Sequence, residues 1–208
     1  APAALVIAKI LYPETEQAAT AGDVSISVEK TDANGIDAAA TGAAVGLKLA
    51  LNVGAMLLAF IALLAMFNGF FGWISDITGL TGVIGSQLSI EMVLGWILAP
   101  VAWIIGVEWS DATTMGSLIG TKIVLNEFVA YLKLADEVSA ANISPKTIAM
   151  ATFALCGFAN FSSIAIQIGG IGGLAPERKS DLAKFGIKAV FAGTMATMMT
   201  ATIAGMLF

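Results

Sequence analysis

Residues 49–74 form an apolar run without a single charged side chain. A helix needs about 20 predominantly apolar residues to cross the hydrocarbon core of a bilayer, so this run is long enough to span a membrane. Such a span is stable because an α-helix satisfies all of its own backbone polar groups inside the lipid. We therefore predict an all-α membrane protein with a transmembrane helix over residues 49–74.

The composition supports this interpretation and excludes several classes of protein. Of the 208 residues, 58% are hydrophobic and 12% are charged, against about 25% charged residues in soluble domains. The net charge of −5 provides no attraction to phosphate backbones, which argues against nucleic acid as a partner. The chain has no histidine and a single cysteine, which excludes intrachain disulfides, Cys/His zinc sites and catalytic triads that use histidine.

The remaining segments are less uniform than this run. Residues 1–11 begin within an apolar stretch and are expected to be the end of a truncated transmembrane helix. The polar residues 12–48 are expected to form a cytoplasmic connection with at most one short amphipathic helix. Residues 147–175 and 187–208 are predicted to span the membrane, the former as a broken helix and the latter as the final helix.

The middle of the chain favours partial entry into the membrane. Residues 90–107 contain Pro100 and three flanking or internal tryptophans, which favour a helix at the interface. Residues 111–135 contain two apolar pieces, each too short to span, joined by the polar segment 120–127. This pattern predicts a re-entrant helical hairpin, with glycines at positions 116 and 120 in a bent, closely packed tip.

The positions of the basic residues predict an orientation. If the helix over residues 49–74 runs outward, seven of the ten basic residues fall on the inner side, namely Lys9, Lys30, Lys48, Arg178, Lys179, Lys184 and Lys188. The positive-inside rule then places residues 12–48 and 176–186 in the cytoplasm. The prediction is a multi-pass protein of the cell membrane (inner or plasma membrane) with its C-terminus outside.

Two polar clusters lie in segments predicted to enter the membrane, where polar side chains are energetically costly. Asn126 and Glu127 occupy the tip of the predicted hairpin, and a carboxylate at membrane depth marks a functional site by default. Alternatively, Glu127 pairs with Lys122 or lies at the surface. The second cluster, with Asn160 and Ser163, interrupts an apolar stretch, as in the discontinuous helices of transporters. Its alternative is hydrogen bonding between intact helices.

Both clusters resemble the signature stretches of the concentrative nucleoside transporters. The similarity runs through GTKIVLNEFVAY at residues 120–131 and FALCGFANFSSIAI at residues 153–166. It continues through the glycines at 169–173 and the final helix, and it covers essentially the whole chain. Chance agreement over motifs of this length is negligible.

This resemblance implies a homotrimeric secondary transporter that takes up nucleosides with a Na⁺ or H⁺ gradient. Members carry two inverted repeats, and this chain resembles the second repeat together with the scaffold helix before it. The resemblance therefore implies that residues 49–74 are that scaffold helix and that residues 90–208 are one transport-domain half. The missing half would supply most nucleobase contacts and the site of the coupling cation, so no metal site and no other cofactor is expected in this half. The ribose contacts of the family match Glu127, Asn160 and Ser163, and Phe158 lines the pocket.

The chemistry of these side chains agrees with such roles. One carboxylate can accept hydrogen bonds from two adjacent ribose hydroxyls, and the amide of Asn160 can donate and accept. Two alternatives remain open. One is a structural or assembly subunit whose polar residues only pack helices, and the other is an intramembrane hydrolase. The latter lacks a histidine base and would need a dyad of Lys122 with Ser162 or Ser163, so we expect no enzyme.

Overall fold

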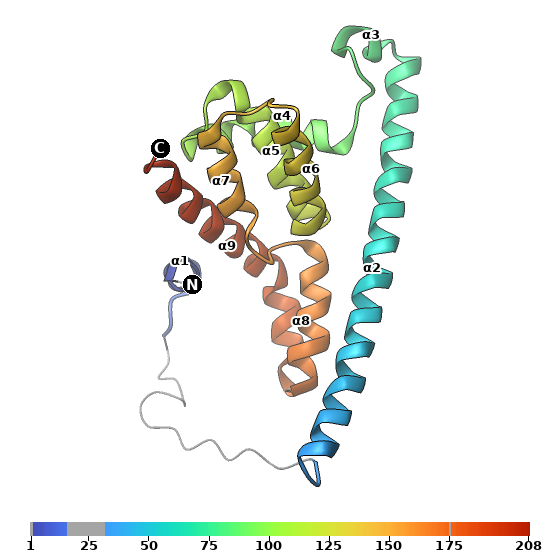
Figure 1. Ribbon diagram of the computed structural model, residues 1–208, viewed down its shortest axis with the longest axis vertical. Helices are drawn as coiled ribbons and strands as arrows, with labels where there is room; N and C mark the ends of the chain where they lie inside the picture. The colour runs from blue at the N-terminus through green and yellow to red at the C-terminus, as the bar shows by residue number, and fades with distance from the viewer. Residues whose placement is uncertain (1, 16–31, 175) are drawn as a thin grey trace.

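The computed structural model describes residues 2–15, 32–174 and 176–208. Within these ranges every regular element is a helix (Figure 1). The helices, in chain order, are α1 (Pro2–Leu11), α2 (Gly35–Ile77), α3 (Leu80–Ile84), α4 (Ile90–Ile104), α5 (Trp109–Val124), α6 (Glu127–Ser139), α7 (Pro145–Leu155), α8 (Phe161–Leu174), the 3₁₀ turn η1 (Pro176–Arg178) and α9 (Lys179–Gly205).

The longest helix, α2, stands beside the bundle formed by the later helices (Figure 1). It begins at Gly35, so the prediction that the connection extends to residue 48 is wrong at its C-terminal end. Asn34 caps the helix, since its Oδ1 accepts the N–H groups of Ile36 and Asp37 at 3.0 Å. The alanine-rich segment that follows has high helix propensity, which outweighs its weak hydrophobic periodicity. The rest of the predicted connection, residues 16–31, lies outside the described residues.

Helices α4 and α5 pack closely against each other through glycines. A Cβ atom on Gly116 would lie 2.6 Å from the carbonyl oxygen of Gly95, and one on Gly120 would lie 2.5 Å from Cβ of Leu94. The prediction that these glycines form the bent tip of the hairpin is therefore wrong. They lie within α5 and permit the close approach of α4.

Helices α5 and α6 are separated by only two residues, Leu125 and Asn126. The connecting segment predicted at 120–127 is therefore mostly helical, because α5 continues to Val124. Asn126 caps α6, with its Oδ1 accepting the N–H of Val129 at 3.0 Å. At the opposite end of α5, the N–H of Ser144 donates to Oδ2 of Asp111 at 2.9 Å. This bond connects the start of α7 to the start of α5.

The core lies between α4, α5, α6 and α7 and is closed by α9. Met115 and Met150 are completely buried there. Helices α8 and α9 pack through Gly186, where a Cβ atom would lie 2.4 Å from Cγ2 of Ile164. Helix α9 starts at Lys179, ahead of the predicted final helix at residues 187–208.

The described helices differ in whether they are long and apolar enough to cross a bilayer. By length and composition α9 could do so alone, and α4 with α5 could do so together across a bend of 119°.

Candidate functional site

The chain between α7 and α8 is not helical over residues 156–160, and Asn160 closes the start of α8. Oδ1 of Asn160 accepts the N–H of Ser163 at 2.8 Å and the hydroxyl of Ser162 at 2.7 Å. The hydroxyl of Ser163 in turn donates to the backbone carbonyl of Asn160 at 2.6 Å. These bonds satisfy backbone groups that the interruption leaves without intrahelical partners.

Glu127 and Asn160 lie together, although 33 positions separate them in the sequence. Nδ2 of Asn160 donates to Oε2 of Glu127 at 3.1 Å. Asn160 is completely buried, whereas Glu127 is partly exposed at the first turn of α6. The carboxylate therefore keeps free acceptor positions, and Nδ2 has a second hydrogen to donate. Asn126, the neighbouring candidate, uses its side-chain oxygen to cap α6 and so positions Glu127.

Lys122 does not bind Glu127 directly. Its Nζ donates to the carbonyl of Ala154 at 3.0 Å and to Oγ1 of Thr197 at 2.9 Å. The hydroxyls of Ser162 and Ser163 are bound to Asn160. Because the amine and the two hydroxyls have other partners, the geometry gives no support to a Ser/Lys hydrolase dyad.

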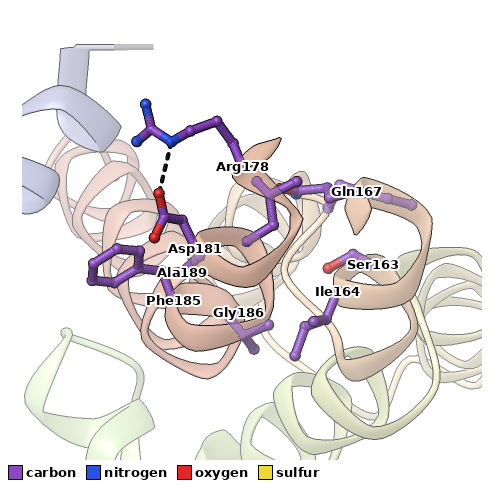
Figure 2. Close-up of a pocket in the computed structure, with 11 residues that line it drawn as sticks. Ser163, Ile164, Gln167, Arg178, Asp181, Phe185, Gly186 and Ala189 are labelled. Atoms are coloured by element: carbon purple, nitrogen blue, oxygen red, sulfur yellow. Dashed lines mark hydrogen bonds and ion pairs between the residues drawn. The ribbon is translucent and has the colours of Figure 1, made fainter. Parts of the chain in front are cut away.

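A cavity of about 390 Å³ lies between α8 and α9 and is reached by two predicted site residues, Phe158 and Ser163. Figure 2 shows Ser163 and Gln167 on the α8 side, and Arg178 with Asp181 at the start of α9. Nε of Arg178 donates to Oδ2 of Asp181 at 2.7 Å. Sequence reasoning did not single out Gln167, although its spacing of four from Ser163 places both on one face of a helix.

A further polar cluster, separate from the groups around Glu127 and Asn160, joins α2 to the bundle. Oε1 of Glu91 forms an ion pair with Nζ of Lys133 at 2.6 Å, and its Oε2 accepts Nδ2 of Asn68 at 2.8 Å. Oδ1 of Asn68 also accepts the N–H of Ile90 at 2.9 Å, at the first turn of α4. This junction of Asn68, Glu91 and Lys133 connects α2, α4 and α6. The three residues of this junction lie far apart in the sequence and share no motif, so the sequence alone does not predict the junction.

In the part of the chain that the structure describes, no group of three or more histidine, cysteine, aspartate or glutamate side chains is placed to hold a metal ion.

Residues 1–205 match the family described as Na⁺ dependent nucleoside transporter C-terminus. The chain belongs to this family. It is 52% identical over 207 residues to the uncharacterized transporter YutK of Bacillus subtilis, covering 99% of this chain and 50% of that protein. It is 49% identical over 209 residues to the nucleoside permease NupC of Helicobacter pylori, covering 99% of this chain and 48% of that protein.

The fold is also that of a solved transporter. The structure of CNTnw in an inward-facing substrate-bound state superimposes with a TM-score of 0.79 at 46% identity, covering 98% of this chain and 47% of that one. The chain thus spans about half the length of the relatives that it matches. The relatives named above are described as a transporter and a nucleoside permease.

Proposed function

We propose that this chain forms the sugar-binding half of a cation-coupled nucleoside symporter. The observation that carries the proposal is the bond between Nδ2 of Asn160 and Oε2 of Glu127, at 3.1 Å, where two interrupted helical segments meet. It holds a carboxylate at a fixed position while leaving hydrogen-bonding capacity on both side chains. A sugar hydroxyl, which donates and accepts, is complementary to that pair.

Glu127 makes the first contact with the sugar, because it is the partly exposed member of the group. Asn160 and Ser163 then form further hydrogen bonds with the ribose, which lies against the non-helical segment between α7 and α8. Phe158 lines the binding pocket beside the ribose. Each hydrogen bond from a hydroxyl to the carboxylate is charge-assisted, and such bonds contribute about 1.5–3 kcal/mol. A deoxy sugar would leave one of these buried groups without a partner.

The helices then have distinct places in the transporter. Helices α5 and α6 form a re-entrant hairpin, and α7 and α8 form one discontinuous membrane helix. Together with α4 as an interfacial helix and α9 as the final span, they make up one half of the transport domain. This unit moves against the scaffold helix α2 in alternating access. The nucleobase contacts and the site of the coupling Na⁺ or H⁺ lie in the other half of a homotrimeric protein whose C-terminus is outside the cell membrane.

Uptake of labelled uridine by the full-length transporter tests this proposal. We expect Glu127→Gln to lower uptake about 10- to 100-fold, since it replaces charge-assisted bonds by neutral ones. Glu137→Gln, in the last turn of α6, serves as the matched control. Normal uptake by Glu127→Gln at normal membrane abundance would contradict the proposal and favour a role in helix packing alone.

A further inference from the structure

Lys122 is a completely buried cation that the proposed transport mechanism does not yet use. It lies in the last turn of α5, two residues before that helix ends. A buried ammonium group is stable only when hydrogen bonds and opposite charges replace its hydration. The hydrogen-bond partners of Lys122 therefore indicate its role in the protein.

One partner is the end of the first half of the interrupted helix. Ala154, whose carbonyl accepts Nζ of Lys122 at 3.0 Å, is in the last turn of α7. Carbonyl groups in the last turn of a helix have no intrahelical partner and carry the negative end of the helix dipole. The ammonium group supplies both a hydrogen bond and a positive charge at this end.

The other partner belongs to the final helix. Oγ1 of Thr197 accepts Nζ of Lys122 at 2.9 Å, and the same hydroxyl donates to the carbonyl of Thr194 at 2.9 Å. Because its proton is used in α9, the hydroxyl of Thr197 is oriented as an acceptor. Gly157 leaves the room for this arrangement, since a Cβ atom there would lie 2.4 Å from Cγ2 of Thr197 and 3.9 Å from Nζ of Lys122.

Lys122 lies five positions before Glu127, which begins α6. Its Nζ shares no hydrogen bond with Glu127, whose Oε2 accepts Nδ2 of Asn160 instead. An ammonium group has three donors, of which two are directed at Ala154 and Thr197. Lys122 thus holds the end of α7, from which the chain continues to Asn160, and leaves the oxygens of Glu127 available to a ligand.

We propose that Lys122 is a positioning residue for the sugar site: it holds the end of α7 to α5 and α9, and it thereby fixes Asn160, and the Glu127 carboxylate that Asn160 binds, in the arrangement that meets the ribose hydroxyls. This inference rests on the proposed function. It adds that the ribose preference depends on a lysine that does not touch the sugar.

The test compares uptake of uridine with that of 2′- and 3′-deoxyuridine by the full-length transporter in proteoliposomes. We expect Lys122→Met to raise KM for uridine about tenfold and to reduce the preference for uridine over the deoxy analogues at least threefold. Lys146→Met, which removes a lysine at the start of α7 outside the site, is the matched control for loss of charge. In Glu127→Gln, the further substitution Lys122→Met should change the preference little, because its effect acts through the carboxylate.

The outcomes separate the two proposals. If Glu127→Gln leaves the ribose preference unchanged, the proposed function fails. If Glu127→Gln changes it but Lys122→Met does not, only the role of Lys122 is overturned. Should Lys122→Met fail to reach the membrane, Thr197→Val provides the decisive variant, since it removes one acceptor of Lys122 and keeps the methyl group against Gly157. We expect Thr197→Val to reduce the preference about twofold, and an unchanged preference would overturn the inference.

Discussion

Helix α2 and the pair α7–α8 are both apolar stretches with isolated polar residues, but they place these residues differently. In α2 the helix is continuous, and large apolar side chains such as Leu58 and Trp73 are 73% and 60% exposed. Its Asn68 reaches outward to the neighbouring α4. Between α7 and α8 residues 156–160 are not helical, and Asn160 has no exposed surface.

The difference shows what an interruption makes possible. A continuous helix satisfies its own backbone, so a polar side chain on it is free only to link neighbours. An interruption leaves backbone groups that need side-chain partners, and it gathers polar atoms at one point. The candidate site is found at the interruption, whereas α2 presents an apolar surface suited to lipid or to other helices.

The largest effect should come from a charge change at the interruption. In Asn160→Asp the atom facing Oε2 of Glu127 at 3.1 Å becomes a carboxylate oxygen, while the acceptor that caps α8 is kept. Two adjacent carboxylates cannot both remain ionised at low cost. We expect uridine uptake by the full-length transporter to fall about 100-fold at equal membrane abundance, together with a lower thermal unfolding midpoint. Uptake above a tenth of normal would remove Asn160 from the site.

The close packing of α4 and α5 should be the next most sensitive feature. A Cβ atom on Gly116 would lie 2.6 Å from the carbonyl oxygen of Gly95 and 2.9 Å from the backbone nitrogen of Ala99. Gly116→Ala should therefore lower the free energy of unfolding by about 1–3 kcal/mol, seen as a lower thermal midpoint in detergent. Gly42→Ala in α2 is its counterpart, because no atom lies within 4 Å of the added methyl group. Equal midpoints for the two variants would contradict this packing.

The junction between α2 and the bundle should have a smaller effect. Glu91→Gln weakens the bond with Lys133 and keeps an acceptor for Asn68. Since the ion pair is partly exposed, we expect a loss of stability of about 1 kcal/mol. The double variant with Lys133→Met should lose little more than either single one. Additive losses in thermal unfolding would show that the two side chains act independently.

The sequence predicts the helical membrane fold and the polar clusters, because uncharged apolar stretches and costly polar residues within them are local signals. It does not predict how α4 packs on α5, since the contact of Gly116 with Gly95 joins two segments without a shared motif. The roles proposed for Glu127 and Asn160 are implied by the resemblance to a family, and their proximity is found in the structure. The partners of Lys122 lie 32 and 75 positions away, beyond any local pattern.

The smallest effect should come from the exposed face of α2. Leu58→Ala removes side-chain atoms that are 73% exposed, so it leaves no cavity. We expect the free energy of unfolding to change by less than about 0.5 kcal/mol, as measured by thermal unfolding in detergent. A loss as large as that of Gly116→Ala would mean that another helix of the assembly packs on this face.

Glu127 and Asn160 are proposed to hold the sugar of a nucleoside. A structure of the full-length transporter with bound uridine tests this proposal most directly. We expect a ribose hydroxyl oxygen within about 3.2 Å of a carboxylate oxygen of Glu127, with the ribose packed against the segment between α7 and α8. Uridine bound with its ribose away from both side chains would contradict the sugar-binding roles of Glu127 and Asn160.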